Sequence, residues 1–309
     1  MTFIVVGIDG GASKTHAIVA DLTGRTLGET VGPGSAVRPG RAEASANVIE
    51  SVVGEALAAC GLSDTPRALA IGVAGIGRDT ERQQLWQALA GRDLASEIVM
   101  QSDFSIALDD AFGDGPGVLI LSGTGSVAFG RGPTGATARC GGWGPNFGDE
   151  GSGAWIGRRA LSVVAAAADG REPETALTGA ILTAVEVDET IDLIGWAADA
   201  TPAQFATLAP VVVAVAESGD LRANAVLTLA VEELVLHARA LARKLFTDER
   251  AALPLALTGG MLGRGSTLRK RLEHRLKSAV PGAQLRTEQV IPARGAVRAA
   301  LRVAGAAVV

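Results

Sequence analysis

The chain is poor in the residues that build disulfide scaffolds, structural metal sites and aromatic binding surfaces. Its 309 residues include two cysteines, three histidines, seven Phe, four Trp and no Tyr. Cys60 and Cys140 form no CxxC pair, and the histidines are widely separated. This spacing excludes a disulfide-rich secreted scaffold and disfavours a structural zinc site.

Positive charge and long apolar runs are also scarce. Lys and Arg number 28 against 33 Asp and Glu, which gives a net charge of −5 and a pI near 5.4. An acidic balance argues against nucleic acid as the main partner, because a phosphate backbone needs clustered positive charge. The longest apolar stretch, 205–216, contains a proline and is too short to span a bilayer, and the first residues lack a basic signal segment. We therefore expect a cytoplasmic protein without a membrane partner.

Glycine and small aliphatic residues, in contrast, are abundant. The chain has 40 Gly, and 48% of its residues are hydrophobic while 20% are charged, so it can bury a large aliphatic core. Its length favours two domains, because single cores stop growing near this size.

One pattern occurs twice: an apolar strand, a Gly-rich turn, a second strand, another turn and a third strand. The first copy covers residues 3–31, and the second begins at residue 117. This repetition indicates an internal duplication, and the alternation of strands and helices around it predicts an α/β protein with two related sheets. We place the boundary between the halves near Asp114-Gly115-Pro116. Further strands are expected at 69–73, 98–101 and 254–257, and helices at 48–60, 82–89, 104–112, 155–168, 174–185, 202–216, 222–246 and 294–303.

The Gly-rich turns are candidate phosphate sites, because glycines at strand ends expose backbone N–H groups. One such turn is explained equally well as a tight hairpin. Two at equivalent places, with a further pair at Gly259-Gly260, favour nucleotide binding. A P-loop is excluded, since Ser13 stands where that motif needs Gly and the next segment is a strand. Lys14 is then interpreted as a solvated hairpin residue.

Two aspartates follow predicted strands, where ligands gather in open α/β sheets. Asp103 lies between the strand 98–101 and a helix, and its ordinary alternative is a helix N-cap. Asp9 could hold Mg²⁺ through water, and its alternative is a turn Asp that bonds its own backbone. Asp109 and Asp110 are interpreted as surface residues.

The segment 141–153, GGWGPNFGDEGSG, is poor core material, because it has little periodicity and two adjacent carboxylates. Carboxylates beside an aromatic residue on a pliable backbone suit a polyhydroxy ligand. The alternative is an Ω-type surface loop before a helix that is capped at Ser152.

The runs GIDGGASKT, SDFS, LSGTGS, GGWGPNFGDEGSGAWIG and LTGGM occur in this order and together resemble the N-acetylglucosamine kinase family, which is grouped with the BadF/BadG-type ATPases. The resemblance covers essentially the whole chain, and GGWG…GDEGS is its most specific part. It implies the fold of actin, Hsp70 and sugar kinases, with two related ribonuclease H-like domains and a cleft between them. The N-terminal domain would be 1–114 with the C-terminal helix 293–309, and the C-terminal domain 115–292.

The resemblance also implies an activity: ATP-dependent phosphorylation of an amino sugar at its 6-hydroxyl, with N-acetylglucosamine as the expected substrate and Mg²⁺ as the metal. Asp103 matches the catalytic base, and Asp9 is the candidate metal residue. The first phosphate loop is matched by Gly10, Gly11 and Ser13, the second by Gly123, Thr124 and Gly125, and the adenosine-side turn by Gly259 and Gly260. The implied sugar-binding residues are Ser35, Gly141, Gly142, Trp143 and Asp149.

Two departures from the family pattern bear on the substrate. The first loop reads GGAS in place of GGGT, and residues 32–36 lack the Asn that often follows the third strand. Glucosamine therefore stays open, since its ammonium group would favour carboxylates such as Asp149 and Glu150. An ATPase that activates an iron–sulfur dehydratase or reductase is a further alternative, as is a sugar-responsive regulator, and the sequence leaves a homodimer open.

Overall fold

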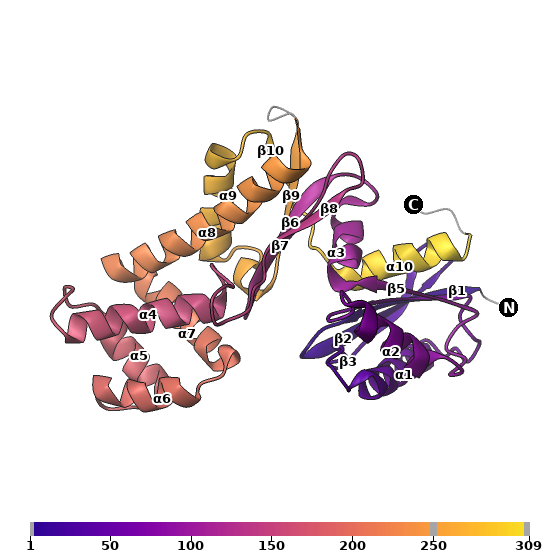
Figure 1. The fold of residues 1–309 in the computed structure, drawn as a ribbon, viewed down its shortest axis with the longest axis horizontal. Helices are drawn as coiled ribbons and strands as arrows, with labels where there is room; N and C mark the ends of the chain where they lie inside the picture. The colour runs from indigo at the N-terminus through magenta and orange to yellow at the C-terminus, as the bar shows by residue number, and fades with distance from the viewer. Residues whose placement is uncertain (1–2, 248–251, 306–309) are drawn as a thin grey trace. The chain divides into compact units, whose positions relative to one another are not determined.

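The structure is a computed structural model that describes residues 3–247 and 252–305. The chain forms two compact units, one of Met1–Asp114 with Glu288–Val309 (unit 1) and one of Gly115–Thr287 (unit 2), each built around a five-stranded mixed sheet (Figure 1). The predicted α/β class with two related sheets is confirmed. Residues 306–309 of the expected C-terminal helix lie outside the described residues.

The sheet of unit 1 has the order β3-β2-β1-β4-β5. Its strands are β1 (Ile4–Gly10), β2 (Lys14–Asp21), β3 (Thr26–Pro33), β4 (Ala68–Val73) and β5 (Glu97–Ser102). The first three strands are antiparallel, whereas β4 runs parallel to β1 and β5 parallel to β4. The carboxyl ends of β1, β4 and β5 therefore meet at one edge of this sheet.

Helices cover both faces of this sheet, and the side chains of β1 alternate between them (Figure 1). Ile4, Val6 and Ile8 pack with α1 (Ala42–Ala59) and α2 (Asp79–Leu89). The opposite face packs on α10 (Pro292–Val303), beside α3 (Asp103–Phe112). Gly295 makes this helix pair close, since a Cβ there would lie 1.8 Å from Ile106 O.

Asp109 and Asp110 are buried between α3 and α10, so their interpretation as surface residues is wrong. Only 1% of the Asp110 side chain is exposed. Its carboxylate accepts hydrogen bonds from Ile291 N at 2.7 Å and from Nε and Nη2 of Arg294, both at 3.0 Å. Asp109 pairs with Arg302. Their partners lie in the last helix and the segment just before it, which local periodicity in α3 does not reveal.

Replacing Asp110 with Ala is expected to lower the free energy of unfolding by about 2 kcal/mol or more, because it leaves the part-buried Ile291 amide and the Arg294 guanidinium without this carboxylate acceptor. Chemical denaturation measures this loss. Asp114→Ala is the control: this side chain is 84% exposed and pairs with Arg302 at the surface. Its loss should stay below about 1 kcal/mol, and equal losses in the two variants would contradict the prediction.

The sheet of unit 2 repeats the arrangement of unit 1, in the order β10-β9-β6-β7-β8. Its strands are β6 (Gly117–Ser122), β7 (Ser126–Arg131), β8 (Thr137–Gly141), β9 (Leu253–Thr258) and β10 (Ala283–Leu285). Again three antiparallel strands come first, then β9 pairs parallel with β6 and β10 with β9. This equivalence agrees with the predicted duplication.

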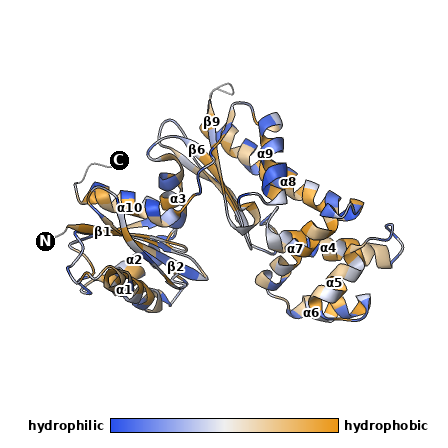
Figure 2. Cartoon of the chain, turned by 180° about the vertical axis from the view of Figure 1, so that it is seen from behind, coloured by the Kyte–Doolittle hydropathy of each residue, from blue (hydrophilic) through white to orange (hydrophobic). Residues whose placement is uncertain are grey.

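The helices of unit 2 form a cover for its sheet and a helical extension. The elements are α4 (Gly153–Ala168), α5 (Leu177–Val185), α6 (Leu193–Asp199), α7 (Pro202–Glu217), α8 (Leu221–Leu245), α9 (Thr267–Ala279) and two short 3-10 turns, Thr190–Asp192 and Gly260–Leu262. Apolar residues line the strands, while α9 carries a largely hydrophilic outer side (Figure 2). Sequence patterns did not reveal α6, α9 and β10. No helix in the described ranges combines the length and the hydropathy that crossing a bilayer requires.

Candidate functional site

The first glycine turn joins β1 to β2. Gly11 N donates to Lys14 O at 2.8 Å and closes a tight hairpin whose tip, residues 12–14, is exposed. Within 3–247 and 252–305, no residue accepts a hydrogen bond from the backbone N–H of Ala12 or Ser13. The hairpin therefore presents donors to an anion, as phosphate binding requires. Lys14 is exposed, as expected for a solvated hairpin residue.

Gly10 is required at the base of this hairpin because its neighbours approach closely. A Cβ there would lie 2.3 Å from Ser35 Oγ and 2.6 Å from Val73 Cγ2. Ser35 is only 1% exposed, and its Oγ lies 2.8 Å from Thr15 Oγ1, which also donates to Pro33 O at 2.6 Å. The structure thus places Ser35 beneath the hairpin, together with Thr15, the last residue of the GIDGGASKT run, to which sequence reasoning assigned no role of its own.

Asp103 is the first residue of α3, at the carboxyl end of β5. The N-cap is Ser102, whose hydroxyl accepts from Ser105 N at 3.3 Å, so the alternative of Asp103 as an ordinary cap is wrong. Burial raises the pKa of Asp103, although the backbone N–H groups of Phe104 and of Asp103 itself act in the opposite direction. A carboxylate that holds protons more tightly than usual is a better general base.

Asp9 lies at the carboxyl end of β1, in the electrostatic reach of Asp103. Burial raises the pKa of Asp9 to about 6, with the charge of Asp103 as the second cause, while His16 and Lys14 lower it. The groups that shift the pKa of Asp9 include no backbone N–H of the turn. The described residues therefore give no support to the alternative that Asp9 is a turn residue bonded to its own backbone. Two coupled, partly desolvated carboxylates thus lie at the sheet edge beside the first hairpin.

This carboxylate pair fits Mg²⁺. A divalent cation neutralises the charge repulsion that raises the pKa of Asp9, and Mg²⁺ typically keeps several waters and uses only one or two protein carboxylates. The described residues contain no cluster of three or more His, Cys, Asp or Glu that could hold a metal by themselves. Asp9, the metal residue expected from the sequence, belongs to this pair, and a single carboxylate that holds the ion through water is compatible with Mg²⁺.

The second glycine turn joins β6 to β7 in unit 2. Gly123 N donates to Gly125 O at 2.9 Å, which closes the hairpin. The carbonyl groups of Gly123 and Thr124 accept from Gly153 N at 2.8 Å and from Ala154 N at 3.2 Å. The first turn of α4 is therefore bonded directly to the hairpin.

The Gly259-Gly260 turn lies next to this second hairpin. Gly259 has a φ of +99°, and a Cβ there would lie 2.3 Å from Ser122 O, so only glycine fits without a shift of the backbone. Gly260 N would lie 3.8 Å from a Cβ at Gly123. The structure thus brings together the second and third predicted glycine turns.

Residues 141–153, here called the GGWG loop, lie against the same hairpin. The Asp149 carboxylate accepts from Gly144 N at 3.2 Å, and a Cβ at Gly125 would lie 2.7 Å from its Oδ2. Burial raises the pKa of Asp149. Trp143 is 63% exposed, with the guanidinium carbon of Arg139 5.0 Å from its ring centre. An exposed indole beside a carboxylate agrees with a carbohydrate contact. Ser152 caps α4, as the sequence suggests.

His237 supports the GGWG loop from α8 and was not found by sequence reasoning. It is 7% exposed, and a Cβ at Gly141 would lie 2.8 Å from its Cε1. Its Nε2 lies 3.8 Å from Glu150 Oε2, and its Nδ1 has no partner among the described residues. Burial lowers the pKa of His237, which favours the neutral ring. Gly142, with a φ of +69°, would place a Cβ 2.8 Å from Val127 Cγ2.

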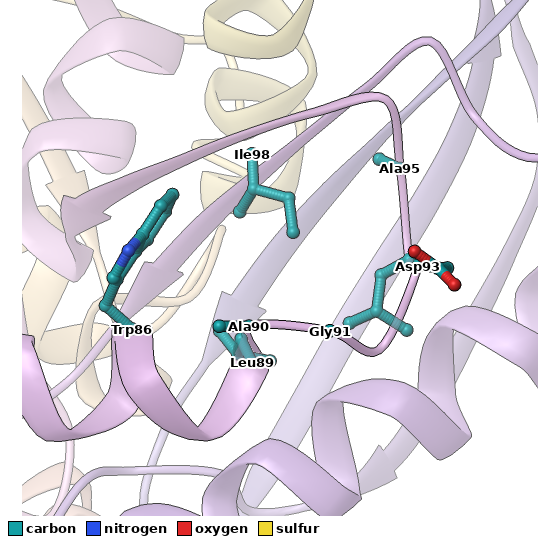
Figure 3. A pocket seen from close by; sticks show the side chains of 8 residues that line it. Trp86, Leu89, Ala90, Gly91, Asp93, Ala95 and Ile98 are labelled. Carbon is teal, nitrogen blue, oxygen red and sulfur yellow. The ribbon is translucent and has the colours of Figure 1, made fainter.

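A separate surface pocket of about 130 Å³ lies in unit 1, between the end of α2 and β5. Trp86, Leu89 and Ile98 line it, and Asp93 is its only ionisable side chain among the described residues (Figure 3). It contains none of the predicted site residues, and its lining includes no basic group that could bind a phosphate.

The fold and these sites define a class: a duplicated α/β protein whose units each carry a Gly-rich hairpin suited to phosphate, with a part-buried carboxylate pair in one unit and a Gly-rich loop with an exposed Trp in the other. The family model of the BadF/BadG/BcrA/BcrD ATPase family matches residues 6–300. The chain therefore belongs to the BadF/BadG/BcrA/BcrD ATPase family.

Individual relatives agree with this assignment. The chain is 32% identical to the N-acetylmuramic acid/N-acetylglucosamine kinase of Clostridium acetobutylicum, over 84% of this chain and 85% of that protein. It is 31% identical to the N-acetyl-D-glucosamine kinase of Dictyostelium discoideum, over 96% of this chain and 98% of that protein. The solved structure of a putative N-acetylglucosamine kinase from Chromobacterium violaceum superposes with a TM-score of 0.78 at 32% identity, covering 96% of this chain and 98% of that one.

Proposed function

We propose that this protein transfers the terminal phosphoryl group of ATP to the 6-hydroxyl of an amino sugar, with N-acetylglucosamine as the preferred acceptor. The observation that carries this proposal is Asp103: a part-buried carboxylate with a raised pKa, at the carboxyl end of β5 and in the electrostatic reach of Asp9. Kinase relatives at 31–32% identity over most of the chain support the same chemistry.

Asp103 acts as the general base in this proposal. It accepts the proton of the sugar hydroxyl as the oxygen attacks phosphorus, and its raised pKa makes it a stronger base than an ordinary Asp. Phosphoryl transfer needs little covalent help from a protein, so the remaining residues bind, orient and neutralise charge. Mg²⁺, held through water by Asp9, would supply charge neutralisation at the phosphates.

The glycine turns bind the nucleotide in this proposal. The exposed N–H groups at Ala12 and Ser13 in the first hairpin and the Gly123-Thr124-Gly125 turn in the second donate to phosphate oxygens. The Gly259-Gly260 turn, which adjoins the second hairpin, contacts the adenosine side. Glycine is needed at Gly259, because a side chain there would collide with the backbone of Ser122.

The GGWG loop binds the sugar in this proposal. Trp143 offers an exposed apolar face to the pyranose ring, Gly141 and Gly142 allow the loop backbone to approach it, and Asp149 accepts a hydrogen bond from a sugar hydroxyl. Ser35, which is buried under the first hairpin, contributes by holding that hairpin rather than by contacting the sugar directly.

A coupled assay of ADP release across acceptors tests the proposal. We expect N-acetylglucosamine to raise ADP release at least about 100-fold over the sugar-independent rate, because the positioned hydroxyl outcompetes water. N-acetylmuramic acid, glucosamine and glucose are the comparison acceptors, and phosphorus NMR of the product locates the phosphate. ADP release that no sugar stimulates would overturn the kinase proposal, and a phosphate on another hydroxyl would overturn the 6-position alone.

The iron–sulfur activator alternative is disfavoured by the cysteines. Cys140 lies on β8 directly before the GGWG loop, and Cys60 packs against the core of unit 1, so each thiol already has a place within its own unit. A brown colour in protein purified without oxygen would restore this alternative.

A further inference from the structure

The second hairpin and the GGWG loop are joined by a dense set of hydrogen bonds. Ser122 and Ser126, which bracket the hairpin turn, both point their hydroxyls at the loop. Ser122 Oγ donates to Gly151 O at 2.8 Å, and Ser126 Oγ donates to Glu150 O at 2.6 Å. Both serines are nearly inaccessible to solvent, with exposed fractions of 0% and 3%.

Further bonds run between the same two segments. The backbone N–H of Ser126 donates to the Asp149 carboxylate, and Gly153 N and Ala154 N donate to the hairpin carbonyls. Asp149 itself takes a left-handed φ of 58°, a strained conformation for a residue with a side chain, which these bonds stabilise. A displacement of the hairpin must therefore also move the loop or break buried hydrogen bonds.

We propose that Ser122 and Ser126 couple the two binding steps, so that a nucleotide phosphate on the hairpin orders the GGWG loop and tightens sugar binding. They are positioning residues that contact neither ligand. This inference rests on the proposed function, because it assigns the hairpin to the nucleotide and the loop to the sugar.

The physical reason is the burial of the two serine hydroxyls. A buried carbonyl that loses its donor is costly, so hairpin and loop change conformation together rather than independently. A ligand that holds one arrangement of the hairpin then selects the matching arrangement of the loop. By linkage, the sugar must tighten nucleotide binding by the same factor.

Titration calorimetry on the full chain tests the coupling. The dissociation constant of N-acetylglucosamine is measured without and with a saturating non-hydrolysable ATP analogue and Mg²⁺, and the analogue is then titrated with and without the sugar. In the unaltered protein, each ligand should tighten the other by about fivefold or more, which is the lower end of ordinary coupling. In Ser126→Ala and in Ser122→Ala, the factor should fall below about two.

Ser152→Ala is the matched control. Ser152 is fully buried in the same loop, and its hydroxyl accepts from Trp155 N as the cap of α4 without bonding the hairpin. It should lose a similar amount of thermal stability but keep the coupling factor. Coupling that is lost equally in all three variants would show a general loosening of the loop and overturn the proposal.

A second measurement needs no substitution, so it stands even if the variants do not fold. Hydrogen exchange of the unaltered chain with the ATP analogue alone should slow in residues 144–153 as well as in the hairpin. Slowing confined to the hairpin, or independent binding of the two ligands, overturns the coupling while leaving the kinase proposal in place. A chain that binds the analogue but no sugar would overturn the proposed function first.

Discussion

Asp103→Asn is expected to lower the turnover number about 10²- to 10⁴-fold, the usual contribution of a general base. The asparagine keeps the size of the side chain and leaves the Ser102 cap of α3 intact, but it cannot accept the hydroxyl proton. Binding of ATP and of the sugar should change little, because the glycine turns and the GGWG loop are untouched. Steady-state kinetics and titration calorimetry separate the two effects.

Asp79→Asn is the matched control for this prediction. Asp79 is the first residue of α2, as Asp103 is of α3, but its side chain is exposed. Asp79→Asn removes a negative charge from the start of a helix that has no catalytic role in this proposal. The lost interaction with the helix dipole is worth well under about 1 kcal/mol, so the turnover number should stay within about twofold of that of the unaltered protein. Normal turnover in Asp103→Asn would show that the base is assigned wrongly.

Asp9→Asn is expected to stabilise the ligand-free protein while it impairs activity. The folded-state pKa of Asp9 is about 6, against 3.8 for an ordinary Asp. Between these values the folded chain holds a proton that the unfolded chain has released. The protonated form of Asp9 is therefore the one compatible with the fold. Its contribution to the free energy of unfolding is fully present below about pH 4 and is lost as pH rises through 6. Removing the charge should add about 1–3 kcal/mol above pH 7.

The activity of the same variant should change in the opposite direction. Without its carboxylate, the chain should need about 10- to 100-fold more Mg²⁺ for half-maximal rate, as for other residues that hold a metal through an outer shell. Thermal unfolding from pH 4.5 to 8 without metal, and rates against Mg²⁺ concentration, measure the two effects. A stability gain that does not grow with pH would contradict the burial of this charge, and unchanged Mg²⁺ dependence would remove Asp9 from the metal site.

Much of the fold could be predicted because it is encoded in local patterns. The continuous apolar run of β1, the Gly-rich turns and the repeated strand–turn–strand order are enough to indicate two related sheets. Helix α9 was not predicted, because its sequence is rich in charged residues. Strand β10 was not predicted, because three residues are too few to show an alternating pattern. The glycine turns could be recognised as sequence motifs. A motif does not show, however, which neighbouring atoms leave no room for a side chain at each glycine.

The candidate site likewise contains residues that sequence motifs reveal and residues that they do not. Its most recognisable residues, Asp103 and the GGWG run, stand in contiguous motifs. Residues that support them stand outside these motifs: His237 reaches Gly141 from a distant helix, and Ser35 lies under the first hairpin, where it contacts Thr15. A supporting residue is defined by what it touches, and sequence spacing does not report contacts between separate elements.

The amino-acid sequence by itself determined the α/β class, the duplication, the family and the identity of the candidate reactive carboxylate, because each depends on residues that are near neighbours in the chain. Only the tertiary structure decided that the charge of Asp103 raises the pKa of Asp9, that Ser126 bonds the GGWG loop, and that Asp110 is buried against an amide 181 residues away. These features arise from desolvation and from hydrogen bonds between distant segments. Both depend on which groups the packing of the sheets and helices brings into contact.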